Sequence, residues 1–241
     1  MVVKGILRVL ADQDSDLEGF EPPYLHPDYR STFLRAPRRE PVKLPNEWFH
    51  RLPGPVFGRI EVKSGDADLT RQHSGEPLGE RIIIAGRVLD GDAAPVRNTL
   101  IEVWQANAAG RYADPVDDHE APLDPNFTGA GRCLTDAQGR YCFITVKPGA
   151  YPWQNHENAW RPAHVHFSIF GPALASRLVT QMYFPGDPLL RLDPILNAIP
   201  DPRGRKLLVS GFDLANTVPG WALAYRWNIV LRGRNATPME A

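Results

Sequence analysis

Prolines recur along the whole chain and limit the folds that it can adopt. There are 24 among 241 residues, roughly twice the usual share. A proline inside a helix removes a backbone hydrogen bond and clashes with the preceding turn, so this frequency excludes a coiled coil or a helical bundle. Hydrophobic residues still make up 43% of the chain, enough to build a core. The length predicts one large all-β domain, with two small domains as the less favoured alternative.

Charge and hydropathy exclude several classes of partner. The chain has 27 Lys and Arg against 28 Asp and Glu, a formal net charge of -1. Nucleic-acid-binding proteins usually carry a basic excess, so we expect no nucleic-acid partner. No apolar run approaches the roughly 20 residues of a membrane span, so we expect no membrane partner. Residues 1–10 lack the apolar core and small-residue cleavage site of a signal peptide, which predicts a cytoplasmic protein.

Residues 1–78 predict an extended N-terminal arm, and residues 79–241 a β-sandwich domain. The first segment holds nine of the prolines, and X-Pro pairs favour extended or turn backbone. A disordered leader is the alternative for roughly the first 15 residues. The arm is also rich in aromatic side chains, which predicts packing on the domain or on a partner subunit. These side chains are Phe20, Tyr24, Tyr29, Phe33, Trp48, Phe49 and Phe57.

Short β-branched segments separated by Gly/Pro turns dominate the rest of the chain, and they predict strands. The segments are Arg81 to Leu89, Thr99 to Gln105, Arg132 to Thr135, Arg140 to Val146, His164 to Phe170, Arg177 to Phe184 and Leu223 to Arg232. Apolar spacing between Pro188 and Leu208 allows one or two short helices. The pattern predicts an all-β fold with a β-sandwich core, and a barrel is the alternative.

A turn segment, DAQG at residues 136–139, predicts a hairpin between two of these strands. The register of that hairpin would place Cys133 opposite Cys142. A disulfide between them is geometrically conceivable. Two buried thiols are favoured instead, because the cytoplasm keeps cysteines reduced.

The segment WRPAHVHF contains His164 and His166, which point to the same face of a strand about 7 Å apart. Both can therefore reach one metal ion, and a polar strand face without a metal is an equally weighted alternative. Zinc would require further ligands, and a ferrous site would require a carboxylate. The ten residues after His166, FSIFGPALAS, contain no carboxylate, which weakens any interpretation based on a nearby acidic ligand.

Two tyrosines, Tyr112 and Tyr151, each follow a predicted strand and a glycine turn, where binding groups tend to lie. A phenol with a pKa near 10 is a poor ligand at neutral pH, but a trivalent hard cation stabilises the phenolate. Two phenolates and two imidazoles suit ferric iron better than zinc. Composition alone favours packed aromatic rings at both positions. The chain then continues into a segment that predicts a solvated acidic loop, with the residues Asp117, Asp118 and Glu120. The side chain of His119 is also expected to be solvated.

Four segments together resemble one protein family. They are NTLIEVWQANAAGRY, APLDPNFTGAGRCLTDAQGRYCFITVKPGAYPW, WRPAHVHFSIFG and YRWNIVLRG. They are similar to the intradiol ring-cleaving dioxygenases, and within them to the iron-binding β subunits of the protocatechuate branch. The similarity runs from about Pro27 to Gly233. It implies a Fe(III) enzyme of the β-ketoadipate pathway that cleaves protocatechuate with O2 to 3-carboxy-cis,cis-muconate.

The resemblance assigns roles residue by residue. The implied iron ligands are Tyr112, Tyr151, His164 and His166, with Tyr151 and His166 axial. Tyr151 would also take a proton from the catechol, and Arg161 would offset negative charge on the reacting substrate, which makes both catalytic. The implied substrate-binding residues are Tyr29, Trp153, Arg161, Gln181 and Ile195.

The resemblance also implies a partner and leaves alternatives open. The partner is an α subunit in an (αβ)n hetero-oligomer; α subunits of the family lack the iron ligands, and this chain keeps all four. Gln154 stands where the family often has arginine, and the arm diverges, so both bear on recognition of the substrate carboxylate. One alternative is cleavage of another catechol, such as hydroxyquinol or catechol itself. The non-enzymatic alternative is a β-sandwich binding module.

Overall fold

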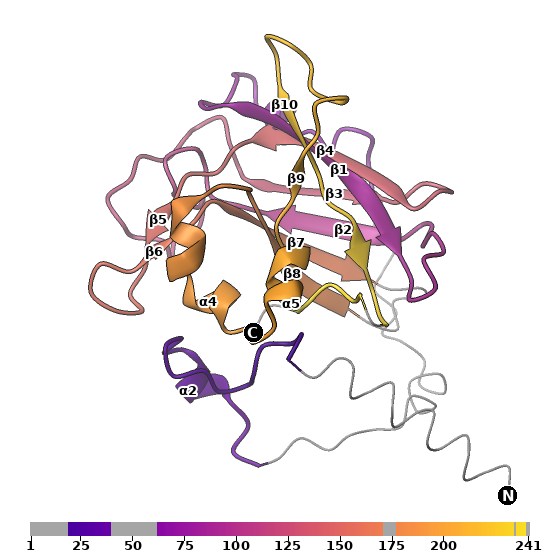
Figure 1. The fold of residues 1–241 in the computed structure, drawn as a ribbon. Helices are drawn as coiled ribbons and strands as arrows, with labels where there is room; N and C mark the ends of the chain where they lie inside the picture. Colours follow the sequence, from indigo (N-terminus) through magenta and orange to yellow (C-terminus); the bar gives the residue numbers. More distant parts are fainter. Residues whose placement is uncertain (1–18, 40–61, 171–176, 234, 240–241) are drawn as a thin grey trace, which may run out of the picture.

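The computed structural model describes residues 19–39, 62–170, 177–233 and 235–239. Its strands form two main sheets and one small ribbon, which confirms the predicted all-β fold (Figure 1). One sheet contains β1 (Arg81–Leu89), β4 (Arg140–Val146), β9 (Gly211–Phe212), β10 (Leu223–Arg226) and β11 (Ile229–Val230). The other has the order β3 (Ala130–Leu134), β2 (Leu100–Trp104), β7 (His164–Phe170) and β8 (Arg177–Tyr183). The ribbon pairs β5 (Tyr151–Pro152) with β6 (Trp160–Arg161).

The hydrophobic core is built from alternating residues of both sheets. Ile82 and Ile84 of β1 are fully buried, as expected for a strand with one face inward. Phe143 of β4 meets Phe167 of β7 edge to face, with 6.1 Å between ring centroids. Both rings are fully buried, so they join the two sheets.

The predicted strand from Leu223 to Arg232 is in fact two strands. Both β10 and β11 pair with β1 in parallel, and Trp227 lies between them. The main chain of Trp227 approaches β1 closely, since its N–H donates to Ala85 O over 2.9 Å. A Cβ at Gly86 would clash with the Trp227 carbonyl oxygen, so glycine permits this approach.

The predicted hairpin is wrong about pairing, although its turn is present. Asp136 N–H donates to Arg140 O over 3.0 Å, which closes the turn. However, β3 pairs with β2 and β4 pairs with β1, so the turn connects the two sheets. Both cysteines are free thiols. Cys133 is buried, but Cys142 is exposed because the neighbouring residues of β4 take the inward positions, so the prediction of two buried thiols is wrong for Cys142.

Three short helical segments follow β8, where one or two were expected. They are η3 (Pro188–Leu192), α4 (Pro194–Asn197) and α5 (Pro202–Leu207). Each begins at an Asp-Pro pair, in which the aspartate caps the helix and the proline occupies its first turn. The segment η3 packs beside β6 and contacts α4, whereas α5 lies near β8 (Figure 1).

The described parts of the N-terminal arm contact the sandwich. Residues 19–39 include α2 (Thr32–Arg35), and residues 62–78 include η1 (Leu69–Arg71), whose Leu69 is fully buried in the core. Arg30 N–H donates to Asn155 Oδ1 over 2.8 Å. The predicted leader and the arm aromatics Trp48, Phe49 and Phe57 lie outside the described residues. The division at residues 78 and 79 stays a prediction.

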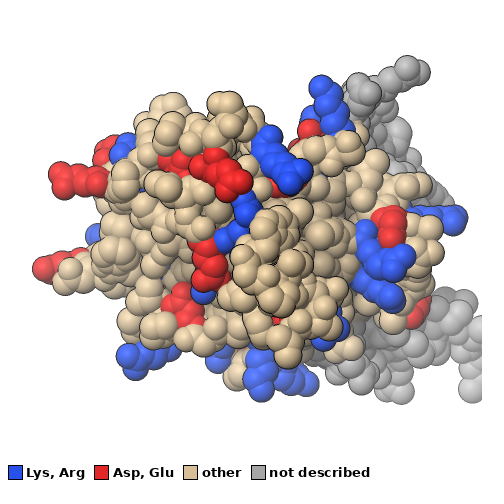
Figure 2. Space-filling model, turned by 90° about the horizontal axis from the view of Figure 1, so that it is seen from above, with Lys and Arg blue, Asp and Glu red and all other residues tan. Residues whose placement is uncertain are grey.

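Charges of both signs are interspersed on the face seen in Figure 2, with neutral surface between them. This distribution agrees with the near-zero net charge of the chain. Among the described residues, no helix is long and apolar enough to cross a membrane.

Candidate metal centre

Four side-chain donor atoms, from β7, from β5 and from the loop that carries Tyr112, converge at one point. Nε2 of His164 lies 3.2 Å from Nε2 of His166, 3.4 Å from Tyr151 Oη and 3.5 Å from Tyr112 Oη. Nε2 of His166 lies 3.2 Å from Tyr112 Oη. The structure therefore brings together all four residues singled out as ligand candidates, from positions up to 54 residues apart in the chain.

Sheet pairing positions the two histidines. Strand β7 is paired on both sides, and every one of its residues is buried. His164 lies opposite Tyr183 of β8, and the ring of His166 stacks on Trp104 of β2 with centroids 4.8 Å apart. Both imidazoles occupy the same strand face, as the i, i+2 spacing predicts.

The protonation pattern of His164 leaves Nε2 available as a ligand. Its Nδ1 lies 2.7 Å from the carbonyl oxygen of Pro162, an acceptor, so Nδ1 carries the proton and Nε2 the lone pair. Burial lowers the pKa of His164 well below its usual value, and the nearby Arg161 and His166 lower it further. The imidazole is therefore neutral, the form that coordinates metals.

Backbone packing between two loops positions the tyrosines. Gly149 N–H donates to Asn107 O over 2.9 Å, which ties the Tyr151 loop to the Tyr112 loop. Gly110 has φ +84°, and a Cβ there would clash with the Ala150 carbonyl oxygen. Glycine is thus required at this contact both for the backbone conformation and for the space. The two tyrosine rings meet edge to face, 5.6 Å apart.

A carboxylate also fixes the Tyr112 loop. Asp117 Oδ2 accepts the Tyr112 N–H over 2.8 Å, and Oδ1 lies 2.6 Å from His119 Nδ1. Both side chains are 20% exposed, so the expectation of a solvated Asp117 and His119 is wrong. The reason is that the loop folds back to satisfy its own backbone donors, which the sequence does not reveal.

The donor set fits a hard trivalent cation. Two atoms bound about 2.1 Å from one ion at angles of 90–120° are about 3.0–3.6 Å apart, which matches the distances observed here. Burial raises the pKa of Tyr151, although Arg161 and Tyr112 act to lower it, so a phenolate needs a stronger positive charge. Across the described ranges, no group of three or more His, Cys, Asp or Glu side chains could hold a metal, so tyrosines are needed to complete this set.

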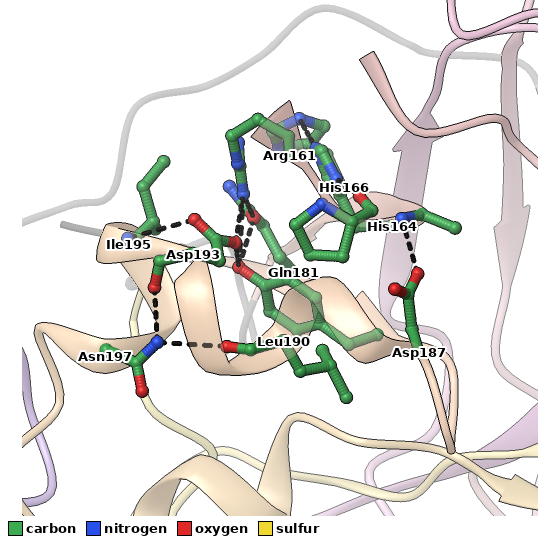
Figure 3. A network of polar contacts seen from close by, with 12 residues as sticks. Arg161, His164, His166, Gln181, Asp187, Leu190, Asp193, Ile195 and Asn197 are labelled. Atoms are coloured by element: carbon green, nitrogen blue, oxygen red, sulfur yellow. Dashed lines mark hydrogen bonds and ion pairs between the residues drawn. The ribbon is translucent and has the colours of Figure 1, made fainter. Parts of the chain in front are cut away.

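Arg161 lies directly beside these donors and is 3% exposed. It pairs with Tyr151 across the β5–β6 ribbon, and its Nη1 lies 3.5 Å from Tyr151 Oη. Its Nη2 donates to Gln181 Oε1 and lies 3.1 Å from Asp193 Oδ2 (Figure 3). A buried guanidinium keeps its charge in this setting because it is paired with a carboxylate.

The remaining candidates extend outward from Arg161. The guanidinium carbon lies 5.5 Å from the Trp153 ring, and Tyr29 of the arm lies 5.5 Å from the same ring. Tyr29 is thus separated from Arg161 by one aromatic ring. Ile195, in α4, is buried on the Asp193 side of the network (Figure 3). The exposed Gln154 adjoins Trp153 in the chain.

Sequence reasoning missed several residues that support this centre. Two of them contact a candidate ligand: Trp104 stacks on His166, and Asp117 accepts the N–H of Tyr112. The other three are Tyr183 and Asp193, which contact Arg161, and Asp187, which accepts the N–H of Ala163 between Arg161 and His164. One signal was available for two of them, because an aspartate before a proline often caps a helix. That pattern does not show where the second carboxylate oxygen points.

Family models match most of the chain. A model described as "Dioxygenase" matches residues 52–233, and one described as "Protocatechuate 3,4-dioxygenase beta subunit N terminal" matches residues 21–47. Among curated proteins, the protocatechuate 3,4-dioxygenase beta chain of Burkholderia cepacia is 60% identical over 221 residues. That alignment covers 91% of this chain and 93% of the relative.

More distant matches include an α chain and a solved structure that shares the fold. The protocatechuate 3,4-dioxygenase alpha chain of Pseudomonas putida is 33% identical, over 66% of this chain and 75% of the relative. Among solved structures, 3-chlorocatechol 1,2-dioxygenase from Rhodococcus opacus superposes with a TM-score of 0.53 at 24% identity. That match covers 74% of this chain and 70% of the other.

Proposed function

Because this chain belongs to the intradiol ring-cleaving dioxygenase family, we propose that it is the iron-binding β subunit of a protocatechuate 3,4-dioxygenase. It cleaves the ring of protocatechuate between the two hydroxylated carbons and places both atoms of O2 in 3-carboxy-cis,cis-muconate. One observation carries the proposal: two phenol oxygens and two imidazole nitrogens converge within 3.2–3.5 Å beside a buried arginine.

Tyr112, Tyr151, His164 and His166 hold Fe(III) in this proposal. Phenolate oxygens are hard anionic ligands, which favour a trivalent ion, and the neutral imidazoles complete the set. When bound, ferric iron supplies Lewis-acid activation of the two catechol oxygens for reaction with O2. The protein contributes the positions of the four ligand atoms, which strand pairing and loop contacts hold in place.

Two side chains act on the substrate. Tyr151 Oη accepts a proton from a catechol hydroxyl, and Arg161 Nη1, 3.5 Å away, stabilises negative charge that develops there. The guanidinium remains protonated throughout. A lysine would not replace it, because an ammonium group lacks the planar fork of N–H donors. The aromatic acid is oriented in this proposal against a wall of four side chains: Gln181, Trp153, Ile195 and Tyr29.

An α subunit is the proposed partner. The described part of the arm exposes apolar side chains that a second chain would cover, and the most exposed is Leu34, at 93%. Large exposed apolar groups close together are typical of protein interfaces. Curated α chains from two bacteria are 31–33% identical to this chain, so an α-like partner would share its fold.

Oxygen uptake with a panel of catechols tests the substrate. The chain is loaded with iron and assayed alone and with a co-expressed α-like subunit, on protocatechuate, catechol and hydroxyquinol. We expect the highest kcat/KM on protocatechuate, with the muconate product identified by mass. A preference for catechol or hydroxyquinol would redirect the substrate assignment. A protein that stays colourless after iron loading and consumes no oxygen would favour the non-enzymatic binding module.

Tyr151→Phe tests the ligand set by spectroscopy. Phenolate-to-iron charge transfer colours the iron-loaded protein, so loss of one phenolate shifts the visible band. Loss of the proton acceptor lowers kcat about 100-fold or more. Tyr24→Phe, at a tyrosine that is 68% exposed in the arm, is the matched control and leaves both unchanged. An unchanged spectrum in Tyr151→Phe would remove this residue from the ligand set.

A further inference from the structure

Three Asp-Pro pairs begin three consecutive helical segments, but their aspartates differ in what else they bind. In each, Oδ1 accepts the N–H of the residue two positions on, over 2.7–3.1 Å. These aspartates are Asp187, Asp193 and Asp201. Capping uses one carboxylate oxygen and leaves the second free for another partner. The second oxygen therefore distinguishes the three.

For Asp201, the second oxygen faces Arg203, whose side chain is 76% exposed, in a surface ion pair of 2.7 Å. For Asp187, it accepts the N–H of Ala163 over 3.1 Å, on the turn that leads into His164. For Asp193, it lies 3.1 Å from Arg161 Nη2, with both side chains at most 4% exposed. Only in the third case does a helix cap bind a side chain assigned to the reaction (Figure 3).

Tyr183 completes the contact between Asp193 and Arg161. Its hydroxyl lies 2.9 Å from Asp193 Oδ2 and 3.1 Å from Arg161 Nη2. It also lies 2.8 Å from Gln181 Oε1, which accepts from the same arginine nitrogen. Three acceptors thus surround Nη2 and leave Nη1 directed at Tyr151 Oη. A rigid fork held on one side points its other nitrogen in one direction.

We propose that Asp193 is a positioning residue that orients Arg161 toward the reacting substrate through their direct ion pair, and that Tyr183, which contacts both side chains, supports it. This inference rests on the role proposed for Arg161 above. Asp193 also receives the N–H of Ile195, a pocket-wall residue, over 3.1 Å. The same carboxylate therefore holds both Arg161 and the start of α4. In this proposal it keeps the charged guanidinium and the apolar Ile195 side chain at a constant distance from each other.

A double-mutant cycle that combines substitutions of Asp193 and Arg161 tests the proposal in the iron-loaded enzyme. Asp193→Asn keeps the size and capping oxygen but removes the charge that holds Arg161, so we expect kcat to fall at least about 10-fold with KM changed less than about 3-fold. In an Arg161→Leu background, the same change alters kcat less than about 2-fold. Asp201→Asn, the matched cap, leaves kcat within about 2-fold of the original.

Thermal unfolding of the metal-free chain supplies a readout that does not depend on activity. Removing one member of a buried ion pair leaves the other unpaired, so Asp193→Asn lowers the Tm by about 6 °C or more. The double variant, with Arg161→Leu, recovers part of that loss. If the proposed reaction itself failed, no variant would turn over substrate, yet this thermal cycle would still measure the pairing.

Tyr183→Phe keeps the proposal testable if Asp193→Asn does not fold. It removes one hydroxyl and no charge, and we expect a fall of about 3- to 10-fold in kcat that disappears in the Arg161→Leu background. Multiplicative losses in the double variants would show that Asp193 and Tyr183 act independently of Arg161. Asp193→Asn with normal kcat and lowered Tm would reduce Asp193 to a structural cap. Either result overturns the proposal.

Discussion

The two histidine ligand candidates and the two tyrosine candidates reach the same point by different means. His164 and His166 lie on β7, which has a partner strand on each side and no exposed residue. Tyr112 lies on a loop, and Tyr151 begins the two-residue strand β5 directly after a loop; both side chains are half-buried. Their positions depend on a glycine contact between the loops and on one aspartate.

This difference illustrates two ways to position ligand side chains: pairing within a sheet, and a few contacts between loops. A central strand fixes its side chains through many hydrogen bonds, so its geometry belongs to the fold as a whole. A loop has few such bonds, and a small number of contacts hold it in place. We therefore expect variants in the strand to remove function through the ligand itself. Variants in the loops should remove it through the backbone.

The largest expected effect is on the strand side. His164→Gln removes an imidazole ligand without disturbing the pairing of β7, and the Lewis-acid contribution of several kcal/mol corresponds to a loss of about 1000-fold or more in kcat. Iron content by metal analysis should fall as well. His156→Gln, at an exposed histidine, is the control. Retention of iron and activity in His164→Gln would exclude this residue as a ligand.

Gly110→Ala tests whether backbone contact holds the tyrosine loops. The methyl group would clash with the Ala150 carbonyl oxygen, and φ +84° is unfavourable for alanine. Gly220→Ala, at φ +73° with open space around it, carries only the conformational cost of about 1–2 kcal/mol. We expect Gly110→Ala to lower the Tm further than Gly220→Ala and to reduce kcat at least about 10-fold. Equal effects of the two substitutions would show that the contact is not needed.

The smallest expected effect concerns the carboxylate under Tyr112. Asp117→Asn weakens the hydrogen bond to the Tyr112 N–H by removing the charge of the acceptor, so we expect a fall of about 2- to 10-fold in kcat. Asp118→Asn, at the exposed neighbour, should change kcat less than 2-fold by comparison. Steady-state oxygen uptake measures both. Indistinguishable kinetics for the two variants would mean that the glycine contact alone fixes the loop.

Local patterns predicted the strands well, and they failed where the partner of a segment mattered. Strands β1, β4 and β7 have the predicted limits, since each has turn residues at its ends. The predicted hairpin failed because β3 and β4 continue into different sheets after a normal turn. A turn sequence specifies how the chain reverses, and not which strand pairs with which.

The candidate site shows the same division. His164 and His166 could be paired from their spacing, because strand geometry is local. The chemistry of phenolate and imidazole allowed the tyrosines to be considered with them, but composition alone favoured packed rings, and only the resemblance to a family assigned them as ligands. Asp193 was not foreseen at all. Its contact with Arg161 spans 32 residues and connects two elements with no shared sequence pattern.

By itself, the sequence determined the all-β architecture, the limits of the main strands and the chemistry of four donor side chains. These follow from backbone preferences, side-chain alternation and ionisation, which act within a few residues. Tertiary structure alone decided which sheets the strands join, how the two loops meet at Gly110, and which carboxylate holds Arg161. Those outcomes depend on contacts between distant segments, and such contacts form only when the whole core packs.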